Sequence, residues 1–445
     1  MRGNGDSWRK YRWHWKCAEK TVLTEKLIHY FRQIPDYRCG REKRHDLGEM
    51  LVCVTLGFLC GRTTIRRSLK WCKTHLEELR KHMNLKYGIA SPSTITRMLN
   101  GIDEELALYA FMEWIGEIVE SRNTHLAIDG KALCGATEKT KGETTPMLLN
   151  VVETVRGLIL AQLPVDSKTN EITAIPELLK LLDISGSIVT IDAVGTQTAI
   201  MEQIHEQGGH FVLTVKKNQP EAYEEIHTFM DKLGAEDLKR KKGEAMDPGM
   251  KEFLEKYEEI SQMEKNRDRN EYRTCQICKD ASNLTKSQKE WPHVQSIGRI
   301  KQVRIPKEKD SQRNDVTPSK EEFLEKGSRR IPAPSAGEGA GKDVQCTALI
   351  SDLILTAEEL GSIKRMHWSI ENRLHHVLDD TFREDSPAKK SRNNLSLIRK
   401  YAYNILRLAM YETGLANIMT EMMDCFCDNA ALRERYVFQG IASLY

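Results

Sequence analysis

Residues 186–215 read GSIVTIDAVGTQTAIMEQIHEQGGHFVLTV, and this stretch decides the fold. Its apolar residues first form a strand-like run, SIVTID, and then recur at helical spacing over TQTAIMEQIHEQ. Gly208 and Gly209 follow that helix, and HFVLTV is a second strand-like run. A helix between two strands is the usual connection of a parallel pair, so this stretch predicts a parallel part of a sheet.

Three further strands are predicted before this unit. They are THLAIDGKA (124–132), MLLNVVETV (147–155) and GLILAQLPV (157–165), and only Arg156 separates the last two, which predicts a hairpin. A helix over IPELLKLLDI (175–184) then leads to SIVTID. The resulting order, β-β-β-α-β-α-β, is that of a ribonuclease-H-like fold. The sequence therefore predicts an α/β protein with a ribonuclease-H-like mixed-sheet core.

The rest of the chain surrounds this core. Residues 22–120 carry apolar residues at helical spacing and predict an all-α N-terminal domain. One of its helices has a basic surface, which suits either DNA binding or plain solvation: Arg66, Arg67, Lys70 and Lys73. We expect five parts: a flexible basic tail at 1–21, the helical domain at 22–120, the sheet core at 121–220 plus 361–415, an insertion at 221–360 with a polar loop at about 306–342, and a C-terminal extension at 416–445.

Composition limits the class of protein. A net charge of +3 does not by itself indicate a nucleic-acid binder. The sequence contains no apolar run long enough to predict a membrane span. Its basic, aromatic start lacks the apolar region of a secretory signal. We therefore expect a cytoplasmic protein. The eleven cysteines are scattered and suit reduced thiols. Cys275 and Cys278 have zinc-like spacing, but EYRTCQICKD alternates like a strand and no second pair follows.

Three acidic residues stand where an apolar element ends or turns inward. Asp129 ends HLAID, Asp192 ends SIVTID, and Glu371 lies in HWSIENRLHHVLDD (367–380), which predicts a helix. At about 100° per residue, Glu371 falls in the middle of the apolar arc of that helix, where a lone charge is costly. A strand-end Asp is often only a cap, and a buried salt bridge would also explain Glu371. Together the three carboxylates suit Mg²⁺ or Mn²⁺ and metal-dependent phosphodiester chemistry.

Long motifs around these residues match a known family. They are AIDGKALCGA (127–136), PVDSKTNEITAIPELLKLLDISGSIVTIDAVGTQ (164–197), GGHFVLTVKKNQP (208–220) and HWSIENRLHHVLDDTFREDSP (367–387). With them the chain resembles the ISAs1-type insertion-sequence transposases, a group of DDE transposases with H-repeat-associated relatives. PDYRCGREKRHDLGEMLVCVTLGFLCG (35–61) and SPSTITRMLNGID (91–103) resemble the domain associated with such transposases.

The resemblance implies a site and an activity. The DDE triad would fall on Asp129, Asp192 and Glu371, which would hold two Mg²⁺ ions about 3.5–4 Å apart, with Mn²⁺ as a substitute. The protein would be a DNA transposase that binds the terminal inverted repeats of its element, cleaves them and transfers the 3′-OH ends to target DNA. A homo-oligomer on paired ends is expected, because two ends are processed together.

Residues near the motifs are candidates for contacts with double-stranded DNA: Lys131, Lys168, Asn170, Lys216, Asn218 and Arg373. Lys168 and Asn170 are expected in a polar turn between a strand and a helix. His367 and His375 are predicted to support the site or the core, because histidine ligands would shift the metal preference away from Mg²⁺. Two other functions stay open: a catalytically silent, transposase-derived DNA-binding protein, and a ribonuclease-H-like nuclease without strand transfer.

Overall fold

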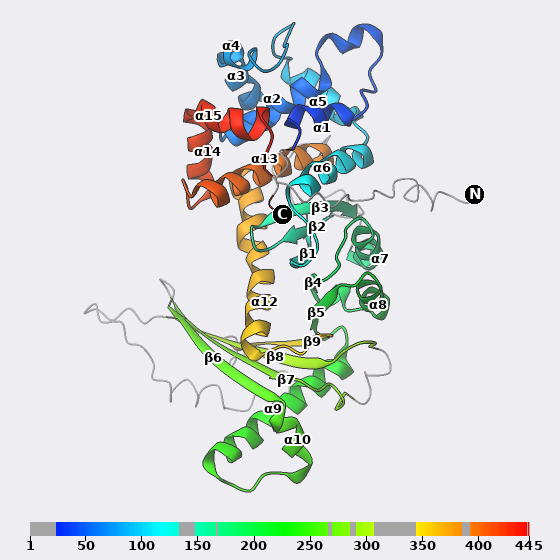
Figure 1. Cartoon of the computed structure of the whole chain (residues 1–445), viewed down its shortest axis with the longest axis vertical. Coiled ribbons are helices and arrows are strands. Elements are labelled where there is room, and N and C mark those ends of the chain that lie inside the picture. The colour runs from blue at the N-terminus through cyan, green and yellow to red at the C-terminus, as the bar shows by residue number, and fades with distance from the viewer. Residues whose placement is uncertain are drawn as a thin grey trace, which may run out of the picture.

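The computed structural model describes residues 24–132, 147–165, 168–265, 269–284, 291–306, 344–384, 392–442 and 444. The predicted tail at 1–21 and nearly all of the predicted loop at 306–342 lie outside these residues. Along the long axis of the molecule, a helical region, the central sheet and the insertion follow one another (Figure 1).

One nine-stranded sheet, in the order β3-β2-β1-β4-β5-β9-β8-β7-β6, runs through the middle and the lower part of the molecule. Its first five strands are β1 (His125–Ala132), β2 (Met147–Glu153), β3 (Leu158–Val165), β4 (Ile188–Ile191) and β5 (His210–Val215). β1, β2 and β3 pair antiparallel, whereas β1 with β4 and β4 with β5 pair parallel. The sheet is therefore mixed, as predicted, and Gly157 at φ +75° makes the predicted turn between β2 and β3.

Helices stand on both sides of these strands. α7 (Lys168–Leu179) and α8 (Thr198–Glu206) lie on one side in Figure 1, and α12 (Ala357–Ile370) lies on the other. α7 begins at Lys168, earlier than the predicted helix at 175–184. Lys168 and Asn170 therefore lie in the first turn of a helix, and the prediction of a polar turn there is wrong.

The insertion extends the core sheet instead of forming a sheet of its own. It contains α9 (Pro220–Lys242), α10 (Lys251–Glu255), β6 (Tyr257–Lys265), β7 (Arg269–Cys278), β8 (Ser296–Pro306) and β9 (Val344–Ser351). β9 pairs antiparallel with β5, so the inserted hairpins continue directly from the core. The sequence did not predict β6.

The zinc-like cysteine pair does not form a site. Cys275 and Cys278 lie three residues apart on strand β7 and pack into two different clusters of the apolar core. Residues three apart on a strand point to opposite faces of the sheet, which explains this separation. Both thiols are free and buried, as the sequence predicts.

The upper part of the molecule is helical (Figure 1). It contains α1 (Leu27–Gln33), α2 (Leu47–Leu59), α3 (Ile65–Thr74), α4 (Leu76–Leu79), α5 (Pro92–Gly101) and α6 (Glu104–Ile118), joined by α13 (Arg392–Thr413), α14 (Met419–Asp428) and α15 (Ala430–Arg433). Every residue of α2 is buried, so this helix is the centre of the region. Ser91 caps α5 by accepting from the Thr94 amide at 3.2 Å. Among the described residues no helix is long and apolar enough to cross a bilayer.

Candidate active site

The two aspartates lie just beyond the paired part of two neighbouring parallel strands: Asp129 is inside β1, which continues to Ala132, and Asp192 directly follows β4. β1 and β4 pair with Ile128 opposite Ile191, and Asp129 and Asp192 are the next residues along each strand. The carboxyl ends of parallel strands meet at the same edge of a sheet, so this register places the two carboxylates beside each other.

Glu371 comes from the end of α12. This helix begins with a capping box formed by Thr356 and Glu359, and its helical hydrogen bonding changes at Glu371, where residues 371–375 are π-helical. Ile370 and Leu374 are buried, but Glu371 is exposed. The prediction that Glu371 lies in the buried arc is wrong, because the 100° step of an α-helix does not hold through a π-turn. Such turns occur frequently at functional sites.

The three carboxylates lie within electrostatic reach of one another. The pKa of Asp129 is raised to about 7, first by burial and then by the negative charge of Asp192, with a smaller effect from Glu371. Glu171 on α7 contributes in the same direction. The Glu171 carboxylate can approach β1 closely because Gly130 has no side chain. A Cβ atom at residue 130 would lie only 2.6 Å from Glu171 Oε1. Only its place in the motif SKTNEI could have pointed to this fourth acidic residue.

Asp192 is paired with a lysine. Burial alone would raise its pKa, but a 2.8 Å hydrogen bond from Lys216 Nζ and the lysine's charge outweigh burial, so the pKa lies below its usual value. Asn218 Nδ2 donates to the Ala193 carbonyl at 3.0 Å, and Gln219 Nε2 donates to the Thr196 carbonyl at 2.5 Å. The segment after β5 therefore fixes the turn that follows Asp192.

The two histidines flank the site without a charge. His367 is buried and its Nδ1 lies 3.0 Å from Thr190 Oγ1, and burial holds its pKa well below the usual value. His375 Nδ1 lies 3.6 Å from Asp129 Oδ2, and burial lowers the pKa of this histidine to about 4. His367 is thus a core residue, and His375 stands beside a carboxylate as a neutral ring.

Lys364 is a site residue that the sequence patterns did not single out. It is 3% exposed, and its Nζ donates to Thr214 Oγ1 at 2.9 Å. Burial lowers its pKa to about 8, while the charges of Asp192, Asp129 and Glu371 oppose that shift. The available signal was its position, seven residues or two helical turns before Glu371 in the sequence. Lys364 therefore brings a buried positive charge close to the three carboxylates.

The other predicted DNA contacts have different surroundings. Lys131 is only 5% exposed, and its Nζ lies 2.5 Å from Glu384 Oε2 and 2.5 Å from Asp379 Oδ1. This placement argues against the predicted phosphate contact of Lys131, because its ammonium group is already paired inside the protein. Arg373 is exposed beside Glu371. The side chains of Lys168 and Asn170 lie outside the described part of the structure.

The donor set fits a hard divalent cation, although it is not arranged around one. Carboxylate oxygens favour Mg²⁺ and Mn²⁺, and a bound cation would offset the burial and the neighbouring charges that raise the pKa of Asp129. In the described ranges no group of three acidic, histidine or cysteine side chains is already placed to hold a metal. Asp192 faces Lys216, and Asp129 Oδ1 accepts from the Gly130 amide at 3.0 Å.

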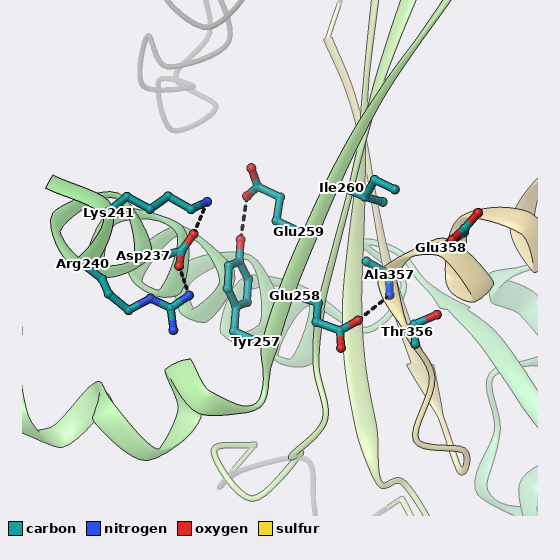
Figure 2. Close-up of a pocket in the computed structure, with 10 residues that line it drawn as sticks. All are labelled: Asp237, Arg240, Lys241, Tyr257, Glu258, Glu259, Ile260, Thr356, Ala357 and Glu358. Atoms are coloured by element: carbon teal, nitrogen blue, oxygen red, sulfur yellow. Dashed lines mark hydrogen bonds and ion pairs between the residues drawn. The ribbon is translucent and has the colours of Figure 1, made fainter.

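A cavity of about 520 Å³ lies elsewhere, in the insertion, where α9, β6 and the start of α12 meet (Figure 2). Its acidic side chains already have partners: Lys241 Nζ lies 2.6 Å from Asp237, Tyr257 donates to Glu259 at 2.7 Å, and Glu258 accepts from the Ala357 amide at 3.2 Å. None of the three carboxylates lines this cavity, so we do not place the active site there.

Known proteins resemble this chain over most of its length. Residues 120–405 match the family described as "Transposase DDE domain", and residues 28–115 match "DDE_Tnp_1-associated". The chain is 28% identical over 386 residues to "H repeat-associated putative transposase YhhI" of Escherichia coli K12, covering 86% of this chain and 90% of that protein. It is 32% identical over 196 residues to "H repeat-associated putative transposase YbfD" of the same organism, covering 44% of this chain and 78% of that protein. A piggyBac transposase synaptic complex with hairpin DNA is a distant structural neighbour, with 10% identity, a TM-score of 0.40, and coverage of 92% of this chain and 78% of that one.

Proposed function

The chain belongs to the DDE transposase family, and from this premise we propose that it cuts the ends of an insertion sequence and joins the freed 3′-OH ends to target DNA. The family and the H-repeat-associated relatives confirm the resemblance found in the motifs. One observation carries the proposal: the β1–β4 register brings Asp129 and Asp192 side by side, and burial followed by the charges of Asp192 and Glu371 raises the pKa of Asp129, which supports a single site built from the three predicted residues.

The topology supports a ribonuclease-H-like core. The first five strands follow the order β3-β2-β1-β4-β5, with one antiparallel half and one parallel half. In this arrangement β1 and β4 are neighbours, and the first two acidic residues of the proposed triad directly follow the last pair of residues that joins these strands. The helix that carries the third follows the insertion.

In the proposed mechanism Asp129, Asp192 and Glu371 hold divalent cations, with Mg²⁺ as the physiological metal and Mn²⁺ as a substitute. When bound, such cations help to activate a water nucleophile and stabilise the leaving 3′ oxygen. The protein keeps the site rigid through Asn218 and Gln219, which hold the turn after Asp192. His375 remains uncharged beside Asp129 and so does not compete with a cation as an ion-pair partner.

DNA binding would use exposed positive groups around the edge of the sheet where Asp129 and Asp192 lie. Lys216 and Arg373 are exposed on either side of the carboxylates, and the first turn of α7, with Lys168 and Asn170, is a further candidate. In the helical region, Arg66, Arg67, Lys70 and Lys73 are all exposed on α3, and none pairs with an acidic side chain in the described part of the chain. Unpaired cations on one helix suit a phosphate backbone.

The test is strand cleavage on a duplex that ends in the inverted repeat found beside the gene. We expect Mg²⁺-dependent nicks with 3′-OH ends, joined products with a second DNA, and loss of both in Asp129→Asn. Binding without cleavage would indicate a silent DNA-binding protein, and cleavage without joining a nuclease. Sedimentation of the complex with paired ends would show whether the proposed homo-oligomer forms.

A further inference from the structure

A buried ion network lies behind the proposed metal site. Glu384 is buried, and its two carboxylate oxygens accept from Lys131 Nζ and from Ser396 Oγ, each at 2.5 Å. Lys131 also pairs with Asp379 at 2.5 Å. The charges of Lys400 and Lys131 hold the pKa of Glu384 below its usual value against the effect of burial. The carboxylate therefore stays ionised in the core.

The end of the catalytic helical segment aims Glu384 inward. After the second π-turn the Phe382 amide donates to the Val377 carbonyl at 3.1 Å, and the Glu384 amide donates to the Leu378 carbonyl at 2.9 Å. Between them Arg383 adopts φ +53°, a left-handed conformation that L-residues rarely adopt. This local strain persists because the surrounding contacts hold it, and its result is a buried carboxylate.

Lys400 connects the network to the strands. Its Nζ donates to Asn150 Oδ1 at 2.7 Å and to Gln162 Oε1, and it is completely buried on α13. Asn150 lies opposite Asp129 in the β1–β2 register, and Gln162 lies opposite Asn150 in the β2–β3 register. Asp129, Asn150 and Gln162 therefore form a polar row across β1, β2 and β3. Asp129 lies at one end of this row, and Lys400 binds the other two residues.

We infer that Glu384 is a positioning residue of the metal site. Lys131 follows Asp129 by two residues on β1, and Glu384 lies in the turn directly after the helical segment that carries Glu371 and ends at Thr381. The Lys131–Glu384 pair therefore links the strand that carries the first carboxylate to the helix that carries the third. Buried ion pairs add little net stability, so this network is better explained by the geometry it fixes than by stabilisation. The inference rests on the proposed function, because it assumes that these carboxylates bind a cation.

The experiment measures Mn²⁺ binding to the DNA-free protein by electron paramagnetic resonance, which does not depend on cleavage. Glu384→Gln keeps the size of the side chain and removes its charge. Asp380→Asn is the matched control, because Asp380 is exposed on the second π-turn and makes no contact with the network in the described structure. We expect Glu384→Gln to bind Mn²⁺ about tenfold more weakly than wild type, with Asp380→Asn within about twofold.

Equal Mn²⁺ affinities for Glu384→Gln and wild type, with both folded, would overturn the inference. If Glu384→Gln does not fold, Glu384→Asp replaces it, because this change keeps the negative charge in the core and withdraws the carboxylate from Lys131 by one methylene group. An unchanged Mn²⁺ affinity in that variant would also overturn the inference. If wild type binds Mn²⁺ through Asp192 but never cuts DNA, only the proposed function is refuted. The Mn²⁺ affinity of the Glu384 variant would still decide whether Glu384 is a positioning residue.

Discussion

Lys216 Nζ donates to Asp192 Oδ2 at 2.8 Å, so one of the three carboxylates proposed to hold the metal forms an ion pair with a lysine. Both side chains are about half exposed, which means that the pair can open without disturbing the core. A cation that binds Asp192 through Oδ2 would displace this ammonium group. The same lysine would then be free to contact a DNA phosphate.

Replacing Lys216 by methionine should tighten metal binding in the absence of DNA. We expect a twofold to fivefold gain in Mn²⁺ affinity, because an exposed ion pair is worth up to about 1 kcal/mol. Isothermal titration with Mn²⁺ measures the gain. Lys217→Met is the matched control, since Lys217 is the exposed neighbour and forms no ion pair in the described structure. An equal gain in the control, or weaker binding in Lys216→Met, would show that the pair does not compete with the cation.

Asp129→Asn should stabilise the metal-free protein while it abolishes cleavage. Burial and the neighbouring carboxylates raise the pKa of Asp129 to about 7, so its ionised form is unfavourable in the folded state. At pH 8 we expect a gain of about 1 kcal/mol or more in the free energy of unfolding. Urea unfolding measures it. Added Mg²⁺ should stabilise wild type and not the variant. A variant less stable than wild type without metal would contradict this electrostatic account.

Acid should destabilise the fold through His125. Burial, together with the charge of Lys364, lowers the pKa of His125 to about 4. The unfolded chain takes up this proton near pH 6.5 and the folded chain only near pH 4, so stability is lost as the pH falls between these values. The decrease reaches up to about 3 kcal/mol. Thermal melts of wild type and His125→Gln across this range test it, and the variant should lose less. If wild type and His125→Gln lose the same stability as the pH falls, His125 is not the source of the acid sensitivity.

The basic face of α3 should govern the salt dependence of DNA binding. We expect the triple variant Arg66→Ala, Lys70→Ala, Lys73→Ala to lower the slope of log affinity against log salt by about 0.9 for each phosphate that is no longer neutralised. Arg80→Ala is the control, because Arg80 is already paired with Glu77 at 2.7 Å. Fluorescence anisotropy with a labelled end duplex measures both. An unchanged slope in the triple variant would mean that α3 only faces solvent.

Much of the fold follows from patterns within short stretches of sequence. The runs that end in Asp129 and Asp192 predicted their strands, and the alternation of helix and strand predicted the mixed sheet. The site was harder to predict where it depends on distant residues. Lys131, Glu384 and Lys400 lie far apart in the sequence and meet only after folding, so a predicted DNA contact at Lys131 is a buried ion pair instead. The exposure of Glu371 depends on a π-turn, which an α-helical wheel does not represent.

We propose that Asp129, Asp192 and Glu371 hold the metal that supports DNA cleavage. Asp192→Cys tests it most directly, because a thiolate binds Mg²⁺ poorly and accepts softer metals. Strand cleavage of an end duplex is measured with Mg²⁺ alone and after Mn²⁺ is added, with wild type as the control. The account predicts no cleavage by the variant in Mg²⁺ and a recovery of about tenfold or more over that background in Mn²⁺. Cleavage by Asp192→Cys in Mg²⁺ at the wild-type rate would contradict it.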